Sequence, residues 1–257
     1  MSSTDQIYIT AAFKSVRQNE VYIFMQNEYV LCDYAPGKKL INGNYSIKEF
    51  ILSDKKYDKI LYGPSHIGAV FSSLECTIFG ELGITCAFAS HDLGIAYIFS
   101  GNICAKWYYG LYSPNNKILE GPKLIVEMFP FLNGTVFANG IDAAFESSRP
   151  FEAYLFKGDQ CARINYSANG QLINNAPIRQ NWPCFKGTIF EHGIDACFAS
   201  HNPHQAYVFK GDSYARIRFI PGVRFDVLIS TGKIKDYWMG LQRILPRKSA
   251  IYYSNCN

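Results

Sequence analysis

The sequence has no apolar run that approaches the ~18 residues needed for a membrane-spanning helix. Its first ten residues, MSSTDQIYIT, lack the basic segment followed by an apolar segment that is typical of a secretory signal. The net charge is only +4 and is scattered, which does not predict a nucleic-acid partner. We therefore expect a cytoplasmic protein that binds neither membranes nor nucleic acids.

Catalytic motifs are missing as well. The chain contains no HExxH, no G-x-S-x-G and no phosphate-binding loop. No Cys and His pair comes with a third residue to orient it. The sequence therefore predicts a protein that is not an enzyme.

No two of the eight cysteines form a CxxC pair. Cys86 and Cys197 stand where related stretches have alanine, so cysteine serves there as a small apolar residue. We expect buried free thiols rather than a disulfide framework, as in a reduced compartment. The eight are Cys32, Cys76, Cys86, Cys104, Cys161, Cys184, Cys197 and Cys256.

What the sequence does contain is one pattern repeated four times. The stretches IYITAAF (7–13), GITCAF (83–88), GIDAAF (140–145) and GIDACF (193–198) share an isoleucine, a small polar residue, two very small residues and a phenylalanine. Repeats at intervals of roughly 50 residues are typical of propellers and solenoids. The small polar column consists of Thr10, Thr85, Asp142 and Asp195.

Each repeat continues with the same spacing. A Tyr-x-Phe follows each phenylalanine, and we expect its tyrosine to pack between blades; these are Tyr22, Tyr97, Tyr154 and Tyr207. Turn residues such as Gly158-Asp159 then predict a tight hairpin into a third strand, because they tolerate positive φ. A bulky aromatic near the end of each unit, often beside a proline, favours an outer strand or a short helix.

Four such units predict an all-β fold, a four-bladed β-propeller with four antiparallel strands per blade around a central channel. Alanine-sized residues on both faces of each first strand fit four strands crowded around one axis. A solenoid is the alternative. We expect one domain over residues 1–246, with blades at about 5–62, 78–128, 136–182 and 189–245 and a surface excursion within 35–62. Residues 247–257 would be a C-terminal tail or a strap returning to the first blade.

The motifs IDAAF…YLFKGDQCARI…NWP and IDACF…YVFKGDSYARI…YW resemble the hemopexin repeat. The resemblance covers roughly residues 5–246, and a single free-standing propeller is most similar to the legume seed albumins of that family. No cysteine precedes Cys32, so closure is expected from strand pairing and packing rather than from a disulfide between the first and last blades.

The resemblance implies a cation, calcium or sodium, in the central channel. In the family, backbone carbonyls at the start of each inner strand converge on it, and the matching positions are Thr10, Thr85, Asp142 and Asp195. Carbonyl oxygens completed by water suit calcium. The alternative is that Asp142 and Asp195 only hold neighbouring backbone N–H groups.

The resemblance also implies binding of spermine or another polyamine, binding of haem, and homodimers. His91 and His201 occupy equivalent positions and are the candidate haem ligands, although they could simply be loop residues copied with the repeat. The polyamine-binding residues are unknown. Arg163 and Arg216 are expected to pair with Asp159 and Asp212, or with carbonyls, between blades. Alternative functions are a seed storage protein without a specific ligand and a carbohydrate-binding lectin (hemagglutinin).

Overall fold

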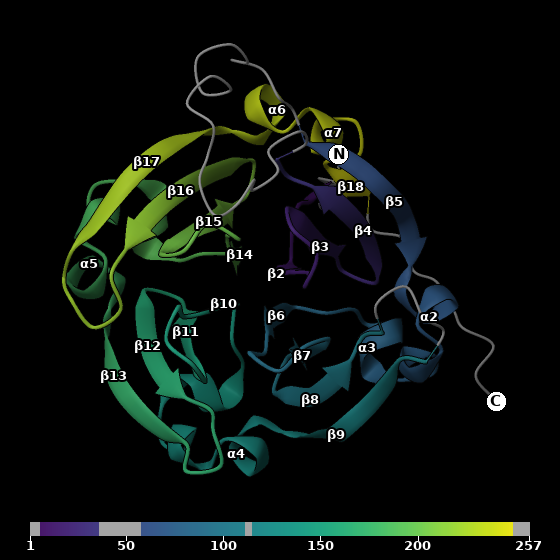
Figure 1. The fold of residues 1–257 in the computed structure, drawn as a ribbon, viewed down its shortest axis with the longest axis horizontal. Helices are drawn as coiled ribbons and strands as arrows, with labels where there is room; N and C mark the ends of the chain where they lie inside the picture. The colour runs from purple at the N-terminus through teal and green to yellow at the C-terminus, as the bar shows by residue number, and fades with distance from the viewer. Residues whose placement is uncertain (1–5, 36–57, 111–114, 249–257) are drawn as a thin grey trace, which may run out of the picture.

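A computed structural model describes residues 6–35, 58–110 and 115–248 of the chain. They form four sheets of four strands, arranged around one axis as the blades of a propeller (Figure 1). In each sheet the strands follow one another in chain order, and all neighbours are antiparallel. The predicted all-β, four-bladed propeller is confirmed, and the solenoid alternative is wrong.

The strands of the four blades are as follows. The first blade has β2 (Ala11–Lys14), β3 (Glu20–Met25), β4 (Glu28–Asp33) and β5 (Lys59–His66). The second has β6 (Cys86–Ala89), β7 (Ile95–Ser100), β8 (Ile103–Tyr108) and β9 (Lys117–Leu124). The third has β10 (Ala143–Glu146), β11 (Glu152–Lys157), β12 (Gln160–Asn165) and β13 (Gln171–Pro177). The fourth has β14 (Ala196–Ala199), β15 (Gln205–Lys210), β16 (Ser213–Phe219) and β17 (Asp226–Lys233).

The inner strands β2, β6, β10 and β14 surround the axis, each beside the inner strands of the two neighbouring blades (Figure 1). Both small columns of the repeat are buried in them, with at most 1% of each residue exposed: Ala11, Ala12, Cys86, Ala87, Ala143, Ala144, Ala196 and Cys197. Larger side chains at these positions would collide across so narrow an axis. The small residues are therefore a requirement of the four-bladed geometry.

The tight hairpins lie where the sequence predicts them. Gly101, Gly158 and Gly211 have φ between +52° and +60°, the left-handed conformation that glycine tolerates. Gln26 adopts it in the first blade, with φ of +59°. The resulting register places each phenylalanine of the repeat opposite the tyrosine of the next strand, as in Phe13↔Tyr22.

A short helix follows each outer strand, so the bulky aromatic belongs to a helical segment and not to a strand. The aromatic ends one helix and precedes the next, as Trp182 does between α5 (Ile178–Asn181) and η4 (Pro183–Phe185). None of the helices in the described residues has the length and apolarity that crossing a membrane requires. The other helices are α2 (Ile67–Val70), η1 (Ser72–Leu74), α3 (Ile78–Glu81), α4 (Ile125–Met128), η2 (Pro130–Leu132), η3 (Val136–Asn139), η5 (Ile189–His192), α6 (Ile234–Tyr237) and α7 (Met239–Gln242).

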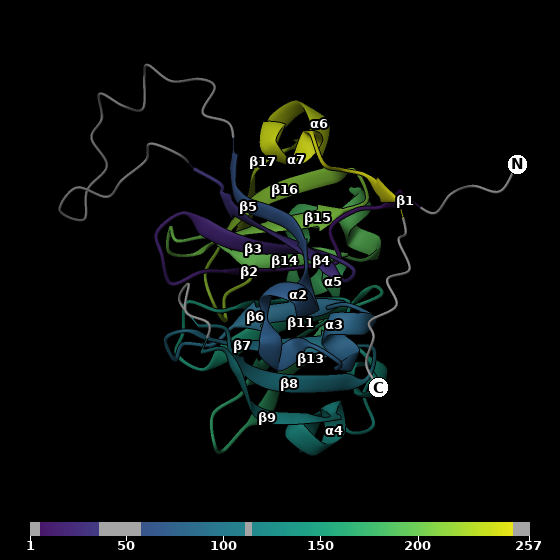
Figure 2. The ribbon, with the colours of Figure 1, turned by 90° about the vertical axis from the view of Figure 1, so that its right-hand side faces the viewer.

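The ring closes where the last blade meets the first. Strand β1 (Gln6–Ile7) pairs with β18 (Arg247–Lys248), and the two lie together in Figure 2. The Arg247 guanidinium also donates two hydrogen bonds to the Glu28 carboxylate, at 2.8 and 2.7 Å. Residues 247 and 248 thus pair with the segment that precedes the first blade, and the rest of the predicted tail or strap lies outside the described residues.

Two predictions need correction or restriction. Six cysteines of the described residues are free, but Cys76 is disulfide-bonded, so the expectation of free thiols is wrong at Cys76. Five of the six free cysteines are buried in strands, where cysteine serves as a small apolar residue, and Cys184 is half-buried in η4. The excursion expected within 35–62 falls mostly outside the described residues, and its end is the start of β5.

Candidate functional site

A cavity of about 630 Å³ opens at the end of the propeller where the inner strands begin. Its lining includes all four small polar residues of the repeat: Thr10, Thr85, Asp142 and Asp195. The resemblance implies that the backbone carbonyls of these positions converge on a channel cation, and the structure places all four residues around one cavity. No cluster of three or more His, Cys, Asp or Glu side chains that could hold a metal occurs in residues 6–35, 58–110 and 115–248.

The four side chains share one structural task. Each accepts a hydrogen bond from the backbone N–H of the residue 16 positions later, in the hairpin of its own blade. The N···O distances are 3.0 Å for Gln26 to Thr10, 3.3 Å for Gly101 to Thr85, and 2.7 Å for both Gly158 to Asp142 and Gly211 to Asp195. The alternative role of the two aspartates is therefore observed. Because the side chains make these bonds, the main-chain carbonyl oxygens are not involved in them.

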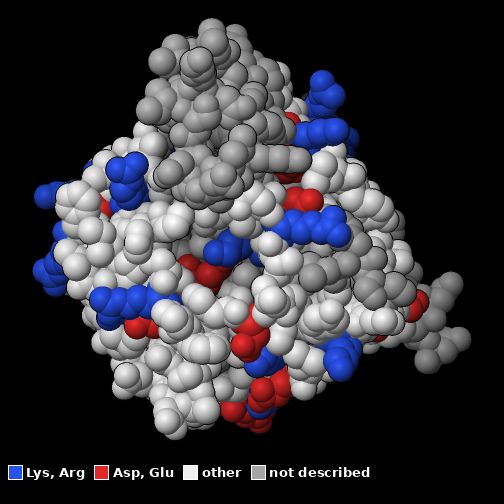
Figure 3. All heavy atoms as spheres, in the orientation of Figure 1, with Lys and Arg blue, Asp and Glu red and all other residues white. Residues whose placement is uncertain are grey.

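Two ammonium groups also reach this mouth. Lys157 Nζ lies 2.7 Å from Asp142 Oδ1, and Lys210 Nζ donates to the Gly193 carbonyl at 3.1 Å. The mouth lined by Thr10, Thr85, Asp142 and Asp195 therefore offers oxygen acceptors that already contact alkylammonium groups. Figure 3 shows the opposite face of the propeller, where acidic and basic side chains also lie around the central hollow.

An ion pair lies across the channel at the ends of the inner strands. Lys14 ends β2 and Glu146 ends β10, in opposite blades, and Lys14 Nζ is 2.9 Å from Glu146 Oε1. The Glu146 side chain is 3% exposed, and neither of its oxygens makes a well-directed hydrogen bond within the described residues. Sequence reasoning missed this pair because the equivalent positions in the other blades are Ala89 and Ala199.

His201 lies in the seam between the fourth and first blades. Its Nδ1 accepts from the Asn19 N–H at 3.2 Å and lies 2.8 Å from the Tyr34 hydroxyl, and its Nε2 is 2.8 Å from the Ser15 carbonyl. Burial lowers the pKa of His201. Both ring nitrogens are therefore occupied by protein contacts.

His91 lies in the opposite seam, between the second and third blades. Its Nδ1 is 2.7 Å from the Tyr166 hydroxyl and accepts from the Phe151 N–H at 3.3 Å. Burial lowers the pKa of His91. The structure does not bring His91 and His201 together, so the two predicted haem ligands do not form one site.

The seams share an aromatic pair. A residue at the end of each third strand packs on the repeat tyrosine of the preceding blade, with ring centroids 5.3 to 5.6 Å apart. This confirms that the repeat tyrosines pack between blades. The pairs are Tyr34 with Tyr207, Tyr109 with Tyr22, Tyr166 with Tyr97, and Phe219 with Tyr154.

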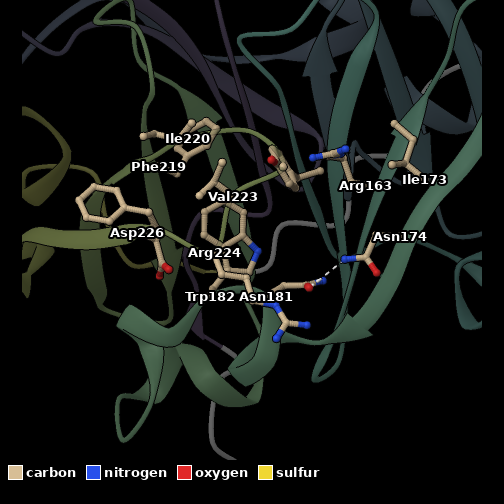
Figure 4. Close-up of a pocket in the computed structure, with 13 residues that line it drawn as sticks. Arg163, Ile173, Asn174, Asn181, Trp182, Phe219, Ile220, Val223, Arg224 and Asp226 are labelled. Atoms are coloured by element: carbon tan, nitrogen blue, oxygen red, sulfur yellow. Dashed lines mark hydrogen bonds between the residues drawn. The ribbon is translucent and has the colours of Figure 1, made fainter.

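A second cavity, of about 270 Å³, lies in the seam between the third and fourth blades. In Figure 4, Arg163, Ile173 and Asn174 come from one wall, and Phe219, Ile220 and Val223 from the opposite one. The predicted pairing of Arg163 with Asp159 is wrong. Arg163 Nε lies 3.5 Å from Glu152 Oε2, because strand pairing places Arg163 opposite Tyr154, far along the hairpin from the turn.

Arg216, in the fourth blade, does not pair with Asp212 either. Its guanidinium donates to Gln205 Oε1 at 3.0 and 2.6 Å and lies over the ring of Tyr207. Asp212 instead pairs with Lys233 at 2.7 Å. The reason is again register, because Arg216 stands opposite Tyr207 and away from the turn that holds Asp212.

Four short blades around a channel lined by alanine-sized residues define a propeller of the hemopexin type. The Hemopexin family model matches residues 141–187, in the third blade. Albumin-2 of Pisum sativum is 46% identical over 241 residues, covering 93% of this chain and 96% of that protein.

Two solved structures from Cicer arietinum are also similar, each covering 93% of this chain and 99% of the other. One is a plant albumin showing hemagglutination, with a TM-score of 0.82 and 46% identity. The other is a plant lectin with two metal binding sites, with a TM-score of 0.84 and 47% identity. The chain belongs to the hemopexin-repeat family, among the seed albumins of the albumin-2 type.

Proposed function

We propose that this seed albumin is a binding protein rather than a catalyst, and that it holds a cation, calcium or sodium, in its axial channel. The observation that carries the proposal is that Thr10, Thr85, Asp142 and Asp195 all line the same cavity. With their side chains tied to the hairpins, their carbonyl oxygens would be the ligands, and water would complete the shell that calcium prefers. A related lectin is described with two metal binding sites, which supports a metal in this family.

Thermal unfolding of chelator-treated protein tests the cation. Added calcium should raise the melting temperature, because a ligand at 100 times its Kd adds about 2.7 kcal/mol of stability. Asp142→Asn should keep most of the effect, since the carbonyl and not the carboxylate is the ligand. No calcium or sodium dependence, together with no metal in the purified protein by elemental analysis, would contradict the proposal.

The second ligand we propose is a polyamine such as spermine. Its chemical support is that alkylammonium groups already contact acceptors in the channel: Lys14 at Glu146, Lys157 at Asp142 and Lys210 at the Gly193 carbonyl. Inner strands of four residues separate the two ends by roughly 13 Å at about 3.3 Å per residue. A polyamine carries several ammonium groups over an extended chain and would compete with these lysines.

Calorimetric titration with spermine tests this competition. Lys14→Met should tighten spermine binding, because it removes the internal competitor for Glu146, and Glu146→Gln should weaken it. Lys186→Met is the matched control, since it removes the same charge from an exposed position. An equal gain in spermine affinity in both lysine variants would mean that only net charge matters. No heat of spermine binding in the wild type or in any variant would contradict the proposal.

Carbohydrate binding is the second candidate function. Relatives are described as hemagglutinating and as a lectin, and the cavity between the third and fourth blades combines aromatic edges with the amides of Asn174 and Asn181. Calorimetry with a sugar panel tests it. A storage protein without a specific ligand would give no heat with sugars, spermine or hemin.

Haem binding, homodimers and a cytoplasmic location stay predictions. A haem held by both His91 and His201 has no support from their placement in opposite seams, so a haem proposal would rest on one histidine at a time. Spectral titration with hemin of His91→Gln and His201→Gln separates the two.

A further inference from the structure

The seam between the third and fourth blades differs from the other three. In the other three seams, a tyrosine hydroxyl makes a hydrogen bond to the neighbouring blade: Tyr34 with His201, Tyr166 with His91, and Tyr109 with the backbone of Val16. The fourth blade has Phe219 in this position, which has no hydroxyl. Ser148 stands where two of the equivalent loops have histidine, and its hydroxyl lies 2.8 Å from His204 Nδ1. The 270 Å³ cavity lies in this seam, where the repeated bond is absent.

Two guanidinium groups converge beside this cavity. A methyl group built on Gly222 would lie 2.7 Å from Arg163 Nη1 and 3.4 and 3.5 Å from the two terminal nitrogens of Arg149. Arg163 has one carboxylate near it, Glu152 at 3.5 Å, and its buried Nε makes no hydrogen bond within the described residues. The guanidinium of Arg149 is exposed and makes no ion pair among those residues. Two converging cations that share one carboxylate leave an unmatched positive charge.

Glycine at position 222 keeps this space open. Its φ is +80°, which disfavours any side chain, and a Cβ would displace Arg163. Arginine forks of this kind bind a carboxylate through two parallel hydrogen bonds. An anionic group could therefore approach the two guanidinium groups beside the loop.

The lining also includes Arg224 and Asp226, and Asp226 accepts a hydrogen bond from the Cys184 N–H at 2.7 Å. The remaining lining residues are neutral and suit a ring that bears hydroxyl groups. Phe225 is 51% exposed and offers an aromatic face, and the edges of Tyr154 and Trp182 form the inner wall. Asn174 Nδ2 donates to Asn181 Oδ1 at 2.9 Å, drawn as the dashed line in Figure 4, and this bond leaves Asn174 Oδ1 as an acceptor. Apolar walls with a few fixed polar groups are typical of small-ligand pockets.

We propose that this pocket binds a sugar ring that carries a carboxylate, as in a uronic or a sialic acid. The carboxylate lies against Arg149 and Arg163, the ring stacks on Phe225, and a hydroxyl donates to Asn174. This inference rests on the second candidate function, carbohydrate binding, and specifies the class of sugar.

Calorimetry with matched ligands tests the proposal. Galacturonic acid and N-acetylneuraminic acid are compared with galactose and with the methyl ester of galacturonic acid, which has the same ring without the charge. We expect at least one acid to bind roughly tenfold or more tightly than its neutral partner, since charge-assisted hydrogen bonds are about twice as strong as neutral ones. Which acid binds distinguishes a plant-wall sugar from an animal-cell sugar.

Variants locate the binding. Arg149→Gln is exposed and should fold normally, and it should lose the preference for the acid while keeping any neutral-sugar binding. Arg218→Gln is the control, because Arg218 is exposed on β16 and does not line the pocket. Phe225→Ala should weaken acidic sugars without affecting inorganic phosphate.

The outcomes distinguish failure of the acidic-sugar proposal from failure of carbohydrate binding, the function on which it rests. Equal affinity for acid and ester, or an Arg149→Gln variant with unchanged preference, overturns the acidic-sugar proposal but leaves carbohydrate binding standing. Phosphate or acetate binding as tightly as the sugar acids also overturns it, since the ring would then contribute nothing. Binding of no sugar at all defeats the candidate function itself.

Discussion

Lys14 and Glu146 lie in opposite blades, yet their side chains meet across the axis, with Nζ 2.9 Å from Oε1. The carboxylate is almost fully buried and the ammonium about one-third exposed. A buried carboxylate without a counter-charge is strongly destabilising, whereas a matched pair approximately offsets its own desolvation. The ion pair therefore links the first and third blades, whose inner strands have no shared sheet.

Lys14→Met should destabilise the protein by about 3 kcal/mol, because it leaves Glu146 charged and buried without a partner. The free energy of unfolding from urea titration at pH 7 measures this. The double variant Lys14→Met, Glu146→Met should recover most of the loss, since it removes both charges and fills the space with apolar groups. A double variant as unstable as the single one would show that the pair does not act as a unit.

Ala144→Leu tests the crowding of the axis. Ala144 is 1% exposed in β10, and three other inner strands surround the same axis. Overpacking a filled site typically costs about 1–3 kcal/mol. Gln171→Leu, at an exposed position of β13, adds a similar side chain without crowding and is the control. Thermal melts of the two variants that coincide with each other would contradict the inner-strand assignment.

The repeated columns predicted the propeller, and the resemblance that rests on them implied the four positions Thr10, Thr85, Asp142 and Asp195. A position such as Asp142 can be found by aligning the repeats alone. The Lys14–Glu146 pair could not be found this way, because its column contains Lys, Ala, Glu and Ala, and only the closed ring brings opposite blades together.

The cavity between the third and fourth blades did leave a signal in the sequence. Tyr34, Tyr109 and Tyr166 directly follow the third strands of three blades, and Phe219 breaks that column. This departure from the repeat marks the seam whose contacts between blades differ from those of the other three. The convergence of Arg149 with Arg163 could not be predicted, because it depends on the path of the loop that contains Gly222.

Asp58→Ala tests the closure between the last and first blades. Asp58 lies before β5 and accepts hydrogen bonds from the N–H groups of Gly240 and Leu241 in α7, at 2.9 and 3.0 Å. Its loss should cost about 1–2 kcal/mol, as for other caps of helical N–H groups. Asp58→Asn should cost less, because it retains one acceptor oxygen.

The measurement for this seam is thermal unfolding combined with hydrogen exchange of the Leu241 amide. Asp92→Ala is the matched control, since Asp92 is half-exposed and its ion pair with Lys106, at 3.6 Å, contributes little. Exchange at Leu241 that is as slow in Asp58→Ala as in the wild type would rule out this role.

His201 should make the seam between the fourth and first blades sensitive to acid. Burial lowers its pKa below the ordinary value of 6.5, so the unfolded chain takes up the proton first as the pH falls. The free energy of unfolding should therefore be unaffected by this group above about pH 6.5, decline as the pH falls below it, and stop declining below the native pKa. Urea titrations at several pH values between 7.5 and 5 should show a smaller decline in His201→Gln than in the wild type, and an unchanged decline in His192→Gln, whose side chain is exposed and outside the seam. Burial also lowers the pKa of His91 in the opposite seam. The double variant of His91 and His201 should therefore show the smallest change in the free energy of unfolding with pH. Parallel profiles for the wild type and His201→Gln would mean that burial in this seam does not lower the pKa of His201.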